Sequence, residues 1–225
     1  MNAVIIVAGG TGTRMSQGVK SQVPKQFLDI NGKPVIVYSI EAFLKADPQI
    51  KVIVSVHKDW MEKWREIKQT FFKGNQIEEV TGGETRFHSV KNALKVSGNS
   101  ELIAIHDAVR PLASESLINR LYDVTRAKGS AIPVMPVIDS MRKYKSEKLI
   151  PVKRENYRII QTPQCFSAET IVSSYEQDFT AEFTDDASVV EAAGYKLNFV
   201  PGERTNIKIT VPEDLKIVTA LLTRN

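Results

Sequence analysis

The sequence predicts an α/β fold, in which a mostly parallel twisted sheet carries helices on both faces. Two observations support this. Short apolar runs, typical of buried strands, alternate with segments whose apolar residues recur three and four positions apart, and most runs end at glycine or a polar turn residue. The chain has 225 residues, 42% hydrophobic and 25% charged, which is average globular usage and enough to bury a core. We therefore expect a single domain, residues 1–225.

The first half of the chain keeps to this alternation. An apolar run closed by glycines opens it, and the segment PVIVYSIEAFL has the apolar spacing of an amphipathic helix. Gly82-Gly83 stops a brief strand, and Gly98 ends the helical pattern that follows. The expected order is strand Ala3–Ala8, helix Pro34–Leu44, strand Lys51–Val56, helix Trp60–Phe72, strand Ile77–Val80, helix Thr85–Val96, strand Leu102–Ile105 and helix Leu117–Ala127.

The second half departs from the alternation once. Residues 139–161 are rich in Lys, Arg and Tyr and hold only the apolar pairs Leu149-Ile150 and Ile159-Ile160, so we interpret them as a protruding arm of two strands. A solvated basic hairpin is the simpler alternative. Around the arm we expect strand Ala131–Val137, helical segments Ala168–Tyr175 and Asp186–Ala193, strand Lys196–Val200 and helix Pro212–Leu222.

Charge and cysteine content exclude several classes of protein. Thirty Lys and Arg against 26 Asp and Glu give a net charge of +4, spread along the chain without the basic stripe of a nucleic-acid-binding surface. MNAVIIVAGG lacks the basic region and cleavage site of a signal peptide, and no eighteen-residue apolar run is present. The single cysteine, Cys165, is interpreted as a small buried hydrophobe in a reducing compartment. We expect a cytoplasmic protein without nucleic-acid or membrane partners.

The most informative segment follows the first strand and reads VAGGTGTRM, with PKQ shortly afterwards. Three glycines allow the backbone to bend and to present N–H groups to phosphate oxygens, while Arg14 and Lys25 supply positive charge. The pattern matches neither a P-loop nor a dinucleotide fingerprint. A plain glycine-rich turn is the alternative, but two cations in the same connection favour a phosphate-binding loop.

GGTGTRM followed by PKQF resembles the sugar nucleotidyltransferase superfamily, which has a Rossmann-like fold. Within it, the chain resembles the 2-C-methyl-D-erythritol 4-phosphate cytidylyltransferase family. The motifs that carry this resemblance occur in one order along residues 3–222: GGETR with Ser89-Val90, HDAVRP, QTPQ with Phe166, TDDA and NIKIT. The resemblance implies transfer of a cytidylyl group from CTP to a polyol phosphate, with release of pyrophosphate and with Mg²⁺ or another divalent cation as cofactor.

The resemblance also implies the site residues. Catalytic cations would be Arg14, Lys25 and Lys208. Nucleotide-binding residues would be Ala8, Gly9, Gly10, Thr11, Gly12, Gly82, Gly83, Ser89 and Asp107. Substrate-binding residues would be Asp107, Arg110, Ser140, Arg154, Thr162 and Lys208, and the arm of residues 139–161 would make a homodimer and cover the neighbour's site. The metal would be held mainly by the CTP phosphates, with Asp107 as a candidate ligand.

Several of these residues have a structural alternative. Lys208 alone could be an edge-strand lysine, and Asp107, directly after a buried strand, could cap a turn. A carboxylate at the carboxyl end of a parallel strand is also where ligands bind in open α/β sheets. Asp185-Asp186 could hold a metal, although we rank a helix cap first. His106 is interpreted as structural.

Two other functions remain open from the sequence. A ribitol-5-phosphate cytidylyltransferase would share the glycine-rich loop and differ only in the polyol. A catalytically silent nucleotide-binding regulator could use the same fold, but such a binder has no need for three cations around one α-phosphate. The alanine of HDAVRP, the TDDAS segment and RENYRIIQ in the arm favour the methylerythritol enzymes over ribitol enzymes.

Overall fold

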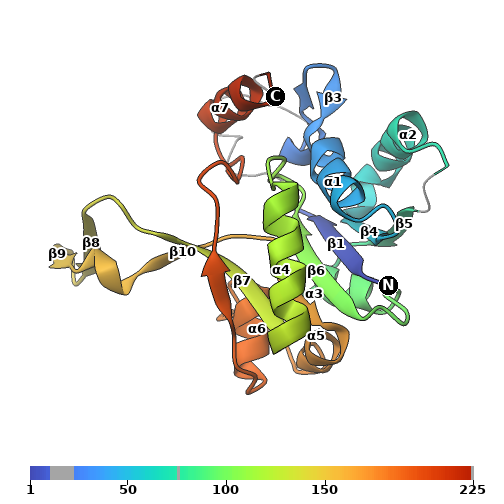
Figure 1. Cartoon of the computed structure of the whole chain (residues 1–225). Helices are drawn as coiled ribbons and strands as arrows, with labels where there is room; N and C mark the ends of the chain where they lie inside the picture. The colour runs from blue at the N-terminus through green and yellow to red at the C-terminus, as the bar shows by residue number, and fades with distance from the viewer. Residues whose placement is uncertain (11–22, 75–76, 224–225) are drawn as a thin grey trace.

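A computed structural model describes residues 1–10, 23–74 and 77–223. Its largest sheet has eight strands in the order β10-β7-β11-β6-β1-β4-β5, with β12 beside β7 (Figure 1). The strands of this sheet are β1 (Ala3–Ala8), β4 (Lys51–Val56), β5 (Ile77–Thr81), β6 (Leu102–Asp107), β7 (Ser130–Pro136), β10 (Arg158–Ile160), β11 (Gln164–Ser167) and β12 (Phe199–Pro201). The α-helices are α1 (Val35–Ala46), α2 (Met61–Phe71), α3 (Arg86–Leu94), α4 (Glu115–Lys128), α5 (Ala168–Ser174), α6 (Asp186–Ala192) and α7 (Pro212–Leu222).

Parallel pairing dominates the sheet, as predicted. Strand β1 pairs in parallel with both β4 and β6, and β4 pairs in parallel with β5. Two strands run against the others: β11 is antiparallel to both β6 and β7, and β10 is antiparallel to β7. The carboxyl ends of β1, β4, β5 and β6 therefore lie at one edge of the sheet, where ligands bind in open α/β folds.

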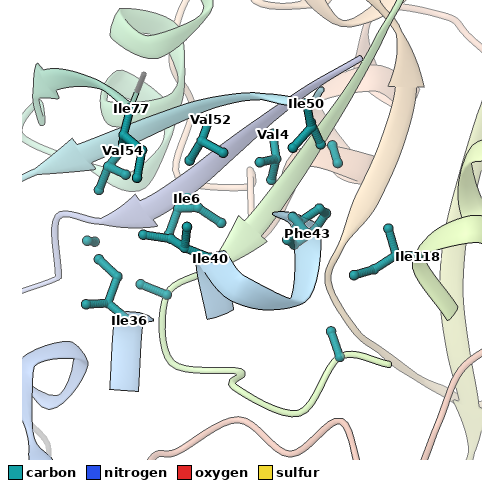
Figure 2. Packing of buried hydrophobic residues seen from close by; sticks show 14 of the residues in the cluster. Val4, Ile6, Ile36, Ile40, Phe43, Ile50, Val52, Val54, Ile77 and Ile118 are labelled. Carbon is teal, nitrogen blue, oxygen red and sulfur yellow. The ribbon is translucent and has the colours of Figure 1, made fainter. Parts of the chain in front are cut away.

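Helices cover both faces of the sheet because consecutive strand residues point to opposite sides. Val4 and Ile6 of β1 pack in one cluster with residues of α1, α2 and α4, and Figure 2 shows Ile36, Ile40 and Phe43 of α1 against this face. Ala3 and Ile5 of the same strand belong to the opposite cluster, with α3, α5 and α6. Since every residue of β1 is buried except the half-buried Val7, the strand is a rigid base for the turn that follows it.

A hairpin of β8 (Met141–Lys145) and β9 (Lys148–Val152) forms a separate two-stranded sheet that projects away from the body of the fold (Figure 1). Its turn uses left-handed backbone at Ser146 and Glu147. The predicted arm boundary needs correction at its far end, because residues 158–160 form β10 and pair with β7 in the main sheet. Ile159 and Ile160 are an isolated apolar pair in a segment rich in Lys, Arg and Tyr, so composition alone assigns them to the arm. Their pairing with β7 at the edge of the sheet appears only in the structure.

Two other expectations differ from the structure. The expected strand Lys196–Val200 is wrong at its start, since only Phe199–Pro201 form β12. Strand β11 was not predicted at all, because QCFS is short, antiparallel and buried between two strands, so it shows neither a long apolar run nor alternation. A small hairpin of β2 (Asp29–Ile30) and β3 (Lys33–Pro34) precedes α1.

Candidate active site

A cleft of about 460 Å³ opens at the carboxyl edge of the sheet. It is lined by the end of β1, by the segment that starts α3, by the end of β6 and by a C-terminal segment: Val7, Ala8, Gly9, Gly10, Lys25, Gln26, His57, Gly83, Glu84, Thr85, Arg86, Ser89, Asp107, Val109, Lys208, Ile209 and Thr210. Residues from segments far apart in the sequence therefore meet around one space.

Asp107, the last residue of β6, is the carboxylate at the centre of this cleft. One of its oxygens lies 2.9 Å from the Lys208 ammonium and 3.5 Å from Nε of Arg110, and the other lies 3.6 Å from Nε of Arg86. Burial alone would raise the pKa of Asp107, but these three cations outweigh it and hold the pKa below its ordinary value. Asp107 is therefore ionised throughout the neutral range.

The backbone of residues 206–210 places Lys208 opposite Asp107. Ile209 donates its N–H to the Val109 carbonyl at 2.9 Å, and Arg110 donates through Nη1 to the Asn206 carbonyl at 2.8 Å. The segment is not a strand in the structure, so the edge-strand interpretation of Lys208 is wrong. Its side chain, 45% exposed, lines the cleft while the backbone is fixed on both sides.

Lys25 and Gln26 also line the cleft, from a 3₁₀ turn of residues Lys25–Phe27. The Lys25 ammonium donates to the Thr210 carbonyl at 2.6 Å, which joins this turn to the segment that carries Lys208. The buried amide of Gln26 donates to the carbonyl of Ala8 at 2.7 Å and to that of Gly10 at 3.2 Å. Gln26 thus fixes the start of the glycine-rich turn, a role that its sequence context did not indicate.

Gly82 and Gly83 lie where the chain passes closely over the start of α3. The Ser89 hydroxyl accepts from the Gly83 N–H at 3.1 Å and donates to the Thr85 carbonyl at 2.9 Å. A Cβ at Gly83 would lie 2.3 Å from Cβ of His88, and one at Gly82 would lie 3.1 Å from Oγ of Ser89. Gly83 therefore requires glycine for close packing, whereas a Cβ at Gly82 would need Ser89 to move by a few tenths of an ångström, and neither position has a positive φ.

His106 is structural in its contacts, as expected. It is fully buried, its Nε2 lies 3.0 Å from the Arg110 carbonyl, and its Nδ1 lies 3.2 Å from the Thr162 hydroxyl, which also accepts from the Asp107 N–H at 3.1 Å. A carbonyl only accepts, so Nε2 carries the proton and Nδ1 accepts from Thr162. Burial lowers the pKa of His106 to about 4, so the ring is neutral.

The structure does not bring all predicted site residues to the cleft. Thr11, Gly12 and Arg14 lie outside the described residues. Thr162 and Arg110 lie behind Asp107, where their side chains support it, and neither lines the cleft. Ser140 and Arg154 belong to the arm region, and Arg154 donates to the Ile138 carbonyl within it. Their substrate contacts stay predictions.

Two further expectations can be compared directly with the contacts. Asp185 caps α6 by accepting from the Ser188 N–H at 2.9 Å in a capping box, so the first-ranked interpretation is confirmed. Asp186 pairs with Arg86 instead of with a metal. Cys165 is fully buried, and burial raises the pKa of its thiol, as expected of a small hydrophobe.

These contacts define what the cleft can do. Lys25, Arg86 and Lys208 present positive charge to a space that also offers backbone N–H groups near the strand ends. Among the described residues, His57 is the histidine that lines the cleft, and its Nδ1 accepts from the Asp59 N–H at 3.3 Å. Such a site suits two polyanions that react with each other, since it supplies charge stabilisation and positioning more than proton transfer.

A Rossmann-like sheet with a cationic cleft after a glycine-rich first turn defines a nucleotidyltransferase. The family model for "2-C-methyl-D-erythritol 4-phosphate cytidylyltransferase" matches residues 2–224, and the chain belongs to this family. Proteins of that name from Bacteroides thetaiotaomicron and Bacteroides fragilis are 42% and 43% identical to this chain over 220 residues, covering 98% and 97% of this chain and 99% and 98% of those proteins.

Solved structures agree with this assignment. The 4-diphosphocytidyl-2C-methyl-D-erythritol synthase of Anaerococcus prevotii superposes with a TM-score of 0.82 at 27% identity, covering 100% of this chain and 99% of that protein. The cytidylyltransferase of Thermus thermophilus gives a TM-score of 0.78 at 28% identity, with 100% of both chains covered. The fold predicted from the sequence and the family resemblance are both confirmed.

Proposed function

We propose that this chain transfers the cytidylyl group of CTP to 2-C-methyl-D-erythritol 4-phosphate, giving 4-diphosphocytidyl-2-C-methyl-D-erythritol and pyrophosphate. This is one step of the non-mevalonate route to isoprenoid precursors. The observation that carries the proposal is the arrangement of Lys25, Arg86 and Lys208 around the same cleft as Asp107. Three cations beside the ionised carboxylate of Asp107 suit a charged acceptor that also carries hydroxyl groups.

The acceptor supplies its own nucleophile. The second ionisation of a phosphomonoester lies near pH 6, so the acceptor phosphate is largely dianionic at neutral pH and needs no protein base. Its oxygen attacks the α-phosphorus of CTP, a new P–O–P bond forms, and the bond to the β-phosphate breaks with the electron pair leaving on pyrophosphate. The protein must bring two polyanions together and stabilise the charge that spreads over the α-phosphate.

The residues divide this work by position. Ala8, Gly9 and Gly10 at the end of β1, together with the Gly82-Gly83 segment, would bind the nucleotide through backbone groups, with the Ser89 hydroxyl nearby. Lys25, with Arg14 from outside the described residues, would stabilise the triphosphate and the α-phosphate. Lys208 would take the acceptor phosphate, and Asp107 would accept hydrogen bonds from polyol hydroxyls.

Magnesium enters the proposal as part of the nucleotide substrate. Among the described residues no group of three or more His, Cys, Asp or Glu side chains could hold a metal ion. The carboxylate in the cleft, Asp107, already faces three cations. The donor set therefore fits a divalent ion held mainly by the CTP phosphates, where it would neutralise charge on the leaving pyrophosphate.

The arm is the basis for a proposed homodimer. Tyr144, Leu149 and Ile150 on the β8–β9 hairpin are 70%, 59% and 44% exposed, an unusual set of apolar groups for an isolated hairpin. A second copy of this chain would cover them and place Arg154 and Ser140 over the partner's cleft. We place the reaction in the cytoplasm, where CTP is available. Within the described residues, no helix is both long enough and apolar enough to span a bilayer.

Pyrophosphate release from the purified protein tests the proposed function. With CTP and Mg²⁺ we expect release with methylerythritol phosphate and little with ribitol-5-phosphate, and little when ATP, GTP or UTP replaces CTP. Faster pyrophosphate release with ribitol-5-phosphate than with methylerythritol phosphate would identify ribitol-5-phosphate as the acceptor and leave the mechanism unchanged. No release with either acceptor, together with tight CTP binding, would favour a nucleotide-binding regulator instead.

A further inference from the structure

A partly buried ion pair joins α6 to the cleft from outside it. Arg86, the first residue of α3, donates through Nη1 and Nη2 to the two carboxylate oxygens of Asp186 at 2.8 and 2.6 Å. Asp186 is fully buried, and its Oδ1 also accepts from the Tyr175 hydroxyl at 2.7 Å. Asp186 lines no part of the cleft, but its partner does.

This pairing leaves one edge of the Arg86 guanidinium for the cleft. The two Nη groups are directed at Asp186, while Nε lies 3.6 Å from Asp107. Because the guanidinium is planar and a bidentate pair fixes its orientation, the Asp186 contact also fixes the direction in which Nε points. Asp186 and its neighbour Tyr175 therefore control how Arg86 faces Asp107.

We propose that Asp186 is a positioning residue that holds Arg86 against Asp107 and so sets the geometry of the acceptor side of the site. The inference rests on the proposed cytidylyl transfer. Without Asp186, the partly buried guanidinium would have Asp107 as its remaining carboxylate neighbour among the described residues and would rotate toward it. Arg86 would then compete with Lys208, whose ammonium lies 2.9 Å from the same carboxylate.

The fold shows why Asp186 is suited to this task. It is the first residue of α6, directly after Asp185, which caps the helix and accepts from Gln164 of β11 at 2.9 Å. Gln164 also accepts from the Ala187 N–H at 2.8 Å, so both ends of its amide hold the start of α6 against the sheet. The ion pair of Arg86 and Asp186 thus joins the start of α3 to the start of α6, which is itself held against the sheet.

The variant that tests the proposal is Asp186→Asn, and Asp185→Asn is its matched control. Both remove one carboxylate from the start of α6, but only the first contacts Arg86. For Asp186→Asn we expect kcat/KM for the acceptor to fall at least 30-fold while KM for CTP changes less than threefold. For Asp185→Asn we expect a lower melting temperature, with both kinetic constants within threefold of wild type. Asp186→Glu, which keeps the charge, should recover most of the loss.

Tyr175→Phe covers the case in which Asp186→Asn does not fold. It removes one hydrogen bond to Asp186 and keeps the ring, which stacks on Phe87 with centroids 4.7 Å apart. A three- to tenfold loss of acceptor kcat/KM, with KM for CTP unchanged, is expected. Equal losses for acceptor and CTP in the folded variants, or equal effects of the Asp185 and Asp186 changes, would overturn the proposal.

A spectroscopic measurement separates this proposal from the proposed function. The Nε–H resonance of Arg86, assigned through Arg86→Lys, should exchange slowly in the wild type and shift or broaden in Asp186→Asn but not in Asp185→Asn. An inactive wild type would contradict the cytidylyl transfer, and these spectra would still report on Arg86. An unchanged Arg86 resonance in Asp186→Asn would overturn the positioning role whatever the activity.

Discussion

The Lys208 ammonium lies 2.9 Å from a carboxylate oxygen of Asp107. In the proposed reaction, this pair would hold the lysine in place for the acceptor before substrate arrives. An incoming phosphate dianion can then take up the exposed ammonium, while Asp107 keeps Arg86 and Arg110 as partners at 3.6 and 3.5 Å. The pair therefore links acceptor binding to the charge of one carboxylate.

Replacing Lys208 should damage catalysis much more than stability. Its side chain is 45% exposed, and its backbone contacts do not involve the ammonium. We expect Lys208→Ala to lower kcat/KM for the acceptor by about 10²-fold or more, the usual effect of losing one group that stabilises transition-state charge. Steady-state kinetics with each substrate varied in turn measures this. Lys216→Ala, an exposed lysine on α7, is the control, and a similar loss there would indicate a general charge effect.

Gly83 should tolerate no side chain. An added Cβ would lie 2.3 Å from Cβ of His88 and 3.0 Å from its carbonyl carbon, so α3 would have to move away from the cleft. We expect Gly83→Ala to raise KM for CTP at least tenfold and to destabilise the fold by about 1–3 kcal/mol. Gly10→Ala, whose added Cβ has no atom of the described residues within 4 Å, should leave the free energy of unfolding nearly unchanged. Equal melting temperatures for the two variants would contradict the packing argument.

His106 should make stability depend on pH. Burial lowers its folded-state pKa to about 4 from an ordinary 6.5, so between these values the unfolded chain binds a proton that the folded chain does not. Its contribution is therefore complete above about pH 6.5 and is lost as the pH falls to about 4, with a slope of about 1.4 kcal/mol per pH unit. The difference between wild type and His106→Gln in urea titrations from pH 4 to 7 measures this slope. A constant difference would show that His106 does not titrate in this window.

The arm should matter to the acceptor more than to the nucleotide. If Arg154 reaches a partner's cleft, Arg154→Ala should raise KM for the acceptor at least tenfold and leave KM for CTP within threefold. Leu149→Asp, which puts charge on the exposed face of β9, should shift the protein toward monomer in sedimentation experiments. A dimer that survives Leu149→Asp, or an Arg154→Ala variant with equal effects on both substrates, would be incompatible with an exchanged arm.

Divalent metal should be obligatory although the described residues form no resident metal site. Because the ion is held by CTP, excess chelator should abolish turnover and added Mg²⁺ should restore it at once. The melting temperature without nucleotide should be the same with and without chelator. Full activity in excess chelator would contradict the proposed role of the metal.

The sequence predicted the architecture well because its strands are buried on both faces. Runs such as Ala3–Ala8 and Leu102–Ile105 stand out against the amphipathic helices between them. Strand β11 was missed because four residues carry no periodicity of their own, and its pairing with β6 and β7 depends on residues far away in the sequence. The arm was recognisable as an interruption, but its boundary at β10 was not.

The sequence signalled Lys25 as a cation near a glycine-rich loop and Asp107 as a carboxylate after a buried strand, but Lys208 only through the family resemblance. All three line the cleft. Residues that act through others gave no such signal. Gln26 holds the carbonyls of the first turn, and Asp186 holds Arg86 across 100 positions of sequence. Only the three-dimensional arrangement shows that these side chains support the cleft.

The central claim is that the acceptor's own phosphate attacks the α-phosphorus of CTP. Methylerythritol phosphate labelled with ¹⁸O in its phosphate oxygens tests it most directly, with purified protein, CTP and Mg²⁺, and with the products followed by ³¹P NMR and mass spectrometry. We predict that the label stays in the diphosphate of the cytidyl product and that pyrophosphate carries none. Labelled pyrophosphate, or no diphosphate product at all, would contradict the account.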